Sequence, residues 1–205
     1  MKDKILEGAH SLFIQYGVRS VSMDDVARAL SMSKKTLYQH FSNKDDLVTE
    51  AVRLHMEREA KEFDDIHEEA DNAIAELFLI SRCMREHVLN LNPSLLYDLQ
   101  KYHANAWELF QQFKKEYLMG QISRNLDRGI QEGFYRKEIN AKVLAMYRVE
   151  SVQLIFNDQL FPRPEFDFAD VQMQVFDHFV HGLLSDLGRE LYRTHLEMNS
   201  ENHSK

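Results

Sequence analysis

The segment from Gly17 to Leu47 constrains the fold most, because it fits two short helices joined by a tight turn. Ser22 stands where an N-cap is needed, and Asp25, three residues later, occupies the acidic position of a capping box. Ser31 falls in the turn, and Ser33 precedes the second helix as its cap. The caps and their spacing predict a helix-turn-helix.

Apolar residues at helical spacing give this segment a small core and one exposed face. An additional helix begins near Lys2 and ends at Gly17, since glycine commonly follows a helix end. In the first helix the apolar positions at helical spacing are Ile5, Leu6, Ala9, Leu12, Phe13 and Tyr16. The residues assigned to the buried side of the next two helices are Val26, Ala27, Leu30, Leu37 and Phe41. This register turns the polar side of the helix after Ser33 toward solvent. Its exposed residues are Lys34, Lys35, Thr36, Tyr38 and His40.

A helix that presents cations and hydrogen-bonding side chains suits the major groove of DNA. Lys44 lies in the first turn of the next helix, where a cation opposes the helix dipole unless an anion such as a phosphate is near. The alternative is an ordinary helical hairpin with surface lysines. The coincidence of caps, turn spacing, apolar register and the Thr-Leu-Tyr-x-x-Phe run favours DNA binding.

The run Ser-Lys-Lys-Thr-Leu-Tyr-Gln-His-Phe-Ser-Asn-Lys-Asp-Asp-Leu, residues 33–47, resembles the tetracycline-repressor (TetR) family of bacterial transcription regulators. The resemblance implies a homodimeric repressor that binds a palindromic double-stranded DNA operator and responds to an unknown small-molecule effector. It implies phosphate contacts from Ser22, Tyr38, His40 and Lys44, with Lys34, Lys35 and Thr36 nearest the base edges. Ser31 departs from the glycine usual in the family's turn, and serine is less favourable than glycine if that residue is left-handed.

The net charge of −8 is unevenly distributed along the chain. Residues 1–48 carry seven Lys/Arg and six acids, so the acidic excess lies in the remainder. Because screening limits the field of distant charges, this balance is compatible with phosphate contacts from the first segment. The single cysteine excludes an internal disulfide, and no apolar run reaches membrane-spanning length. We expect a cytoplasmic protein with no membrane partner.

The remaining chain predicts more helices, so the fold class is all-α with about nine helices. We expect a DNA-binding domain over residues 1–47 and an effector-binding and dimerisation domain over 48–198. The predicted later helices cover 44–64, 68–90, a short helix from Asn92-Pro93, one ending at Gly133, 143–159, and about 168–192.

Polar residues set among apolar ones are the candidates for effector binding, because a buried polar group needs a partner. They are Arg82, His87, His103, Tyr147 and Gln153. Each of them is equally compatible with a hydrogen bond to another side chain. The aromatic residues between Tyr97 and Tyr117 fit a plain core as well as a cavity lining.

No cofactor or metal site is expected. His178 and His181 are spaced as two ligands on one helix, but the spacing supplies no third ligand. A packed or dimeric helix face accounts for them better.

Dimerisation is predicted through residues 143–156 and 168–187, whose apolar residues exceed the needs of one monomer core. Gly182 would permit a close helix crossing. A four-helix bundle between two chains would place two recognition helices about 34–36 Å apart, one turn of DNA.

Two other functions compete with this interpretation. An all-helical enzyme lacks support, because no glycine-rich phosphate loop, Gly-x-Ser-x-Gly or di-iron Glu-x-x-His pair is present. A helical protein-interaction module without operator binding is disfavoured by the intact Lys34-Lys35-Thr36 cluster.

Overall fold

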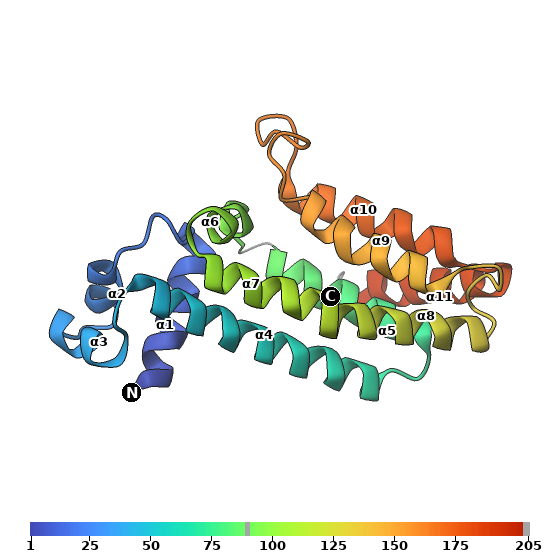
Figure 1. Cartoon of the computed structure of the whole chain (residues 1–205). Coiled ribbons are helices and arrows are strands. Elements are labelled where there is room, and N and C mark those ends of the chain that lie inside the picture. The colour runs from blue at the N-terminus through green and yellow to red at the C-terminus, as the bar shows by residue number, and fades with distance from the viewer. Residues whose placement is uncertain (89–90, 203–205) are drawn as a thin grey trace. The chain divides into compact units, whose positions relative to one another are not determined.

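A computed structural model describes residues 1–88 and 91–202, which form helices and one isolated β-bridge, between Tyr135 and Leu184 (Figure 1). The first helices are α1 (Lys2–Tyr16), α2 (Met23–Ala29), α3 (Lys34–His40), α4 (Lys44–Glu69), α5 (Ala73–Val88), α6 (Leu95–Tyr102) and α7 (Ala104–Phe113). They are followed by a π-helical turn η1 (Lys114–Leu118), α8 (Met119–Gln131), α9 (Ala141–Leu154), α10 (Phe168–Leu183) and α11 (Asp186–Asn202). The all-α class is confirmed.

The chain divides into two compact units. The N-terminal unit comprises residues 1–61 and 89–115, and the C-terminal unit comprises 62–88 and 116–205, of which 89–90 and 203–205 lie outside the described residues. Helix α4 contributes residues to both units. In the described part of the chain, no helix combines the length and apolarity that crossing a membrane requires.

The N-terminal unit is built around the predicted apolar register. Gly17 ends α1 with a φ of 80°, and its N–H donates to the carbonyl oxygen of Phe13. Helix α1 packs on α2 where Gly8 leaves room for the side chain of Leu30. Leu37 and Phe41 are 0% and 1% exposed, so the predicted inward face of α3 is confirmed.

Residues 92–103 pack against the first helices of the same unit, which the sequence did not reveal. The N–H of Asn92 donates to the carbonyl oxygen of Ile14 at 2.7 Å, and that of Arg19 to the buried carboxylate of Asp98 at 3.1 Å. Helix α6 therefore supports the loop between α1 and α2.

Tyr135 organises the core of the C-terminal unit. Its ring is 1% exposed and lies against Gly129 of α8, where a Cβ atom would collide with it. Its hydroxyl donates to Asn125 Oδ1 at 2.8 Å and also lies 3.2 Å from the carbonyl oxygen of Ala73 on α5. One aromatic side chain thus joins α5, α8 and the loop before α9.

The single helix predicted over 168–192 is wrong, because the chain leaves helical geometry at Leu184 and divides it into α10 and α11. The loop after α8 causes the break: the N–H of Ser185 donates to the carbonyl oxygen of Phe134, and its hydroxyl to that of Gly133. The Ser185 hydroxyl then accepts the N–H of Gly188 and caps α11. Tertiary hydrogen bonds replace the helical ones here.

Other predicted bounds also shift. The fourth helix extends to Glu69 rather than residue 64, and α5 begins at Ala73, after the Asn72 side chain accepts the N–H of Ala75. Residues 89–90, the predicted end of that fifth helix, lie outside the described residues. The helix expected to end at Gly133 consists of α7, η1 and α8.

Candidate nucleic-acid interface

The start of α2 is fixed by a reciprocal pair of hydrogen bonds. The Ser22 hydroxyl accepts the N–H of Asp25 at 3.2 Å, and the Asp25 carboxylate accepts the N–H of Ser22 at 2.9 Å. The Ser22 hydroxyl also donates to the Asp25 carboxylate, and this hydrogen bond, together with the one from the Ser22 N–H, lowers the pKa of Asp25 by stabilising its charged form. The predicted capping box is confirmed.

The turn between α2 and α3 contains a left-handed serine. Ser31 has a φ of 52°, and the next residue, Met32, donates its N–H to the carbonyl oxygen of Ala27. Ser33 then caps α3, its hydroxyl accepting the N–H of Thr36 at 3.1 Å. The caps at both ends of the turn set the direction in which α3 leaves it.

The polar face of α3 is open to solvent. Lys34, Lys35, Tyr38 and His40 are exposed, and Thr36 is half-buried. Lys34 forms a 2.7 Å ion pair with Asp24 of α2, which raises the pKa of Lys34. This contact holds the Lys34 amine beside α2, so DNA binding by Lys34 requires it to leave Asp24 or to reach a phosphate from that position.

Gln39 is a candidate that sequence reasoning missed. It is exposed on α3, four residues after Lys35 and three after Thr36, and therefore shares their helical face. A glutamine amide can form a bidentate contact with adenine in the major groove. The signal in the sequence was its helical spacing.

Lys44 is half-buried at the start of α4. Burial lowers its pKa, and the carboxylates of Asp98 and Asp25 partly oppose that effect. A phosphate near the amine would oppose the effect of burial, because a nearby negative charge favours the charged form of the amine. The start of α4 is held in place by Asp45, whose carboxylate lies 2.8 Å from His103 Nδ1.

These capped helices match those of known regulators in sequence. Residues 5–51 match the family described as "Bacterial regulatory proteins, tetR family". The "Uncharacterized HTH-type transcriptional regulator YvaF" of Bacillus subtilis is 30% identical over 188 residues, 91% of this chain and 97% of that protein. The chain belongs to the TetR family. It is a helix-turn-helix, DNA-binding transcription regulator.

Two other likenesses cover different parts of this TetR-family regulator. The "Biofilm operon icaADBC HTH-type negative transcriptional regulator IcaR" of Staphylococcus epidermidis is 35% identical over 52 residues, 25% of this chain and 28% of that protein. The structure of the regulator FadR from Bacillus subtilis in complex with stearoyl-CoA has a TM-score of 0.67 at 16% identity, covering 89% of this chain and 99% of that one. The latter likeness shows the fold.

The five residues predicted to bind the effector are distributed over both units of the regulator. His103 belongs to the N-terminal unit, where it contacts Asp45. Arg82 and His87 are exposed on α5, and Tyr147 and Gln153 lie on α9, Tyr147 half-exposed with its ring 6.3 Å from that of Phe179.

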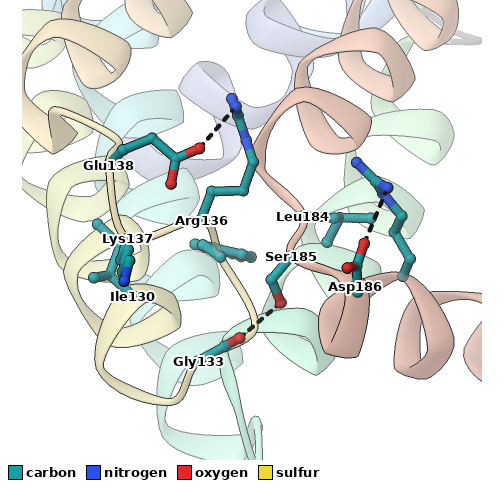
Figure 2. Close-up of a pocket in the computed structure, with 10 residues that line it drawn as sticks. Ile130, Gly133, Arg136, Lys137, Glu138, Leu184, Ser185 and Asp186 are labelled. Carbon is teal, nitrogen blue, oxygen red and sulfur yellow. Dashed lines mark hydrogen bonds and ion pairs between the residues drawn. The ribbon is translucent and has the colours of Figure 1, made fainter.

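A hollow of about 400 Å³ lies where the loop after α8 meets the start of α11 (Figure 2). Charged residues of both signs line it: Arg136, Lys137, Glu138, Asp186 and Arg189. Arg136 and Arg189 are each paired with an acid, Glu138 and Asp186 respectively. None of the five predicted effector residues lines this hollow.

A buried arginine on α9 was not among the predicted site residues. Arg148 is 5% exposed, and its guanidinium donates to the Ser151 hydroxyl at 3.3 Å and to the Met84 sulfur at 3.7 Å. It lies over the rings of Phe176 and Phe179 of α10. Burial lowers the pKa of Arg148 to about 10. The sequence signal was a cation in an otherwise apolar stretch of helix.

Exposed apolar residues gather on α9 rather than on α10. Val143, Met146, Tyr147 and Leu154 are each more than half exposed and recur at helical spacing. The large apolar residues of α10, such as Phe176 and Phe179, are buried within the unit. The apolar excess that the sequence placed on both helices therefore lies on α9, with Gly182 exposed on α10.

Proposed function

We propose that this protein is a ligand-responsive repressor that binds a palindromic operator as a homodimer. The observation that carries the proposal is the doubly capped turn, from which α3 presents Lys35, Tyr38 and His40 to solvent. Residues 1–47 form the DNA-binding domain of the proposal, and residues 48–198 form the effector-binding and dimerisation domain. IcaR, which is similar to this chain over 52 residues, is named a negative transcriptional regulator, and this supports repression rather than activation.

In the proposed complex, the two groups of contacts have different tasks. Lys34, Lys35 and Thr36 lie nearest the base edges, where hydrogen bonds distinguish sequences. Ser22, Tyr38, His40 and Lys44 contact phosphates, which position the helix without reading sequence. The lowered pKa of Lys44 supports its role, because an adjacent phosphate compensates for the loss of water around the amine.

The dimer interface of the proposal includes α9 and α10. The exposed apolar stripe on α9 needs cover from another surface, and exposed Gly182 on α10 lets a second helix approach closely. Two copies related by a two-fold axis would bury both features. The same symmetry would match the two halves of a palindromic operator.

An effector with an acidic group suits the C-terminal domain. A buried guanidinium is costly without a countercharge, and the present hydrogen-bond partners of Arg148 are a hydroxyl and a thioether. A carboxylate or phosphate would stabilise it, while Phe176 and Phe179 offer apolar contact. Arg82, His87, Tyr147 and Gln153 remain the other proposed effector contacts in this unit, whereas the fifth candidate, His103, lies in the N-terminal unit against Asp45. We also propose that the protein is cytoplasmic and has no enzymatic activity.

Effector binding is testable with fatty acids and acyl-CoA thioesters, since the FadR of like fold was solved with stearoyl-CoA. We expect saturable stabilisation of the wild-type protein in thermal unfolding by a member of this set. The effect should be lost in Arg148→Met. Equal stabilisation of both proteins would exclude Arg148 as the anion contact.

Operator binding is tested by selecting a DNA consensus with the protein and then measuring affinity at several salt concentrations. Lys35→Ala or Thr36→Ala should weaken binding to the selected sequence by about 1–3 kcal/mol, because a base contact is lost. Lys44→Ala should weaken binding to all sequences and reduce the salt slope by about one. Lys61→Ala, an exposed lysine later on the same helix, serves as the matched control.

An unchanged affinity in a folded Lys34/Lys35/Tyr38 triple alanine variant would contradict the operator-binding mode. Failure of the wild-type protein to select any DNA sequence would instead favour a helical protein-interaction module.

A further inference from the structure

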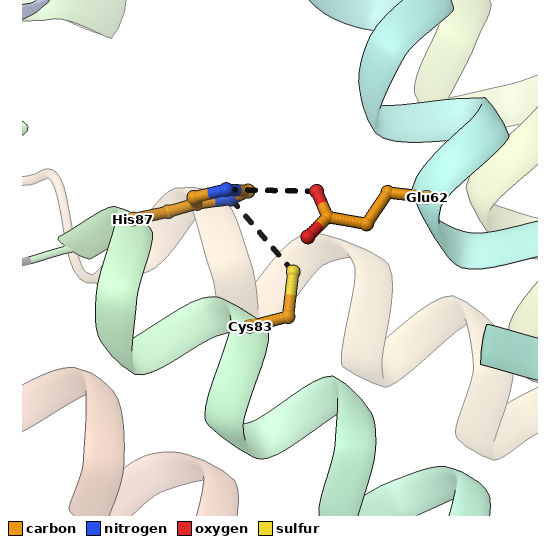
Figure 3. Close-up of side chains that lie close together, drawn as sticks. All are labelled: Glu62, Cys83 and His87. Carbon is orange, nitrogen blue, oxygen red and sulfur yellow. Dashed lines mark hydrogen bonds and ion pairs between the residues drawn. The ribbon is translucent and has the colours of Figure 1, made fainter. Parts of the chain in front are cut away.

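Three side chains with metal-binding atoms converge in the C-terminal unit (Figure 3). Cys83 and His87 come from α5, and Glu62 comes from α4. One sulfur, one nitrogen and one carboxylate oxygen lie within 4.8 Å of one another. This cluster is separate from the turn and α3 face assigned to DNA.

The local geometry follows from helix periodicity and burial. Cys83 and His87 are four residues apart, so their side chains lie on one face of α5, one turn apart. Cys83 is 6% exposed, which fixes its sulfur, whereas the side chains of His87 and Glu62 are 50% and 43% exposed. An ion entering from solvent would meet the two exposed side chains first and the buried sulfur last.

The present contacts already orient these groups toward one another. His87 Nδ1 lies 3.9 Å from Cys83 Sγ, and His87 Nε2 lies 3.5 Å from Glu62 Oε2. Figure 3 shows the imidazole facing both the thiol and the carboxylate. Without a metal, the thiol–imidazole hydrogen bond and the imidazole–carboxylate ion pair account for this arrangement. If no metal binds, these two contacts are the whole role of the cluster.

The donor set narrows the identity of an ion. Thiolate, imidazole and carboxylate are the three ligand types of Zn²⁺ in proteins, whereas Mg²⁺ and Ca²⁺ prefer oxygen alone. Zinc–ligand bonds of about 2.0–2.3 Å at tetrahedral angles hold ligand atoms roughly 3.3–3.6 Å apart. Rotation of the exposed Glu62 and His87 side chains can close the remaining difference, because neither is held by burial.

We propose that Glu62, Cys83 and His87 form a binding site for a divalent transition-metal ion, with Zn²⁺ as the best match. On binding, the Cys83 thiol gives its proton to solvent and the sulfur bonds the metal as a thiolate. One imidazole nitrogen and one Glu62 oxygen complete three protein ligands, and water takes the fourth position. The ion then joins α4 to α5 within the C-terminal unit. The proposal does not depend on operator binding.

The first experiment titrates Co²⁺ and Zn²⁺ into untagged, full-length protein that has been dialysed against a chelator. We expect one equivalent of Co²⁺ to produce thiolate-to-cobalt charge-transfer absorption and intense d–d bands typical of four-coordination, and Zn²⁺ to displace it. Cys83→Ser should abolish the charge-transfer band. Glu62→Gln and His87→Gln should lower affinity by at least the roughly 10–100-fold that loss of a supporting hydrogen bond costs a metal site.

The matched control is the His178→Ala/His181→Ala double variant. Both histidines lie on α10 and do not belong to the cluster, so the variant removes imidazoles without changing the proposed site. It should bind Co²⁺ as the wild type does. Absence of saturable binding to the wild type would overturn the proposal, as would a Co²⁺ spectrum without a thiolate band or one unchanged in Glu62→Gln.

A second measurement uses only the wild-type protein, so its result does not depend on whether a variant folds. Because the sequence contains a single cysteine, alkylation by iodoacetamide reports on Cys83 alone. Zn²⁺ should slow alkylation at least tenfold, and excess chelator should restore the original rate. An alkylation rate independent of Zn²⁺ would contradict ligation by the sulfur.

Discussion

Ser31 holds a φ of 52° in the turn between α2 and α3, a conformation that glycine adopts with less strain. Ser31→Gly should therefore raise the free energy of unfolding by about 0.5–1 kcal/mol, after allowing for the greater freedom of glycine in the unfolded chain. The measurement is the shift in urea midpoint followed by circular dichroism. Ser11→Gly, in the middle of α1, should shift the midpoint the opposite way, because glycine weakens a helix interior. A lowered midpoint in Ser31→Gly would contradict the left-handed turn.

Another single residue, Tyr192, makes the free energy of unfolding depend on pH. Burial raises the pKa of Tyr192 to about 12, and the nearby Asp177 carboxylate adds to the shift. Since an unfolded tyrosine titrates near pH 10, the neutral phenol contributes stability that is complete below pH 10 and lost as pH rises toward 12. The loss should be no more than about 2 kcal/mol. Tyr192→Phe cannot ionise, so the stability difference between wild type and variant should change across this interval. A difference independent of pH would refute the assignment.

At the scale of elements, the junction of the α8–α9 loop with α11 depends on one close backbone approach. A Cβ atom on Gly188 would collide with the carbonyl oxygen of Phe134, and a backbone atom cannot yield as a side chain can. Gly188→Ala should destabilise the fold by about 1–3 kcal/mol by pushing the loop away from α11. Thermal and urea unfolding would measure the change. The control is Gly120→Ala on α8, which has no atom within 4 Å of the added Cβ and should be neutral or slightly stabilising. Equal effects would mean that the loop and α11 do not need this contact.

The whole molecule is expected to act as a dimer through the exposed stripe on α9. A Val143→Glu/Met146→Glu variant places two charges where apolar residues would be buried, so it should shift the protein from dimer to monomer at micromolar concentration. Sedimentation velocity measures the shift, and affinity for the palindromic operator should fall with it. Leu160→Glu changes an equally exposed leucine in the loop after α9 and should leave the dimer intact. A wild-type protein that sediments as a monomer would exclude this assembly.

Local order in the N-terminal part was predictable because its causes are local. The Ser22–Asp25 capping box, the Ser33 cap and the inward positions of Leu37 and Phe41 all follow from residues three or four apart. The exposure of Lys35 follows from the same periodicity. The roles of individual residues on DNA were not determined in this way and remain predictions.

Interactions between residues far apart in the sequence determined the features of the fold that the sequence did not predict. The sequence pattern runs apolar through Leu184, so it predicted one long helix, but hydrogen bonds from Ser185 to residues 133–134 divide it. Likewise, the sequence analysis did not pair Cys83 with His87 as metal ligands, and only the tertiary structure brings Glu62 of α4 close to both of them. Periodicity records which face of a helix is apolar. It does not record which distant segment lies against that face. The helix-turn-helix could therefore be predicted from the sequence alone, because its causes are local. The α10–α11 break and the three-residue cluster required the tertiary structure, because they depend on contacts between distant segments.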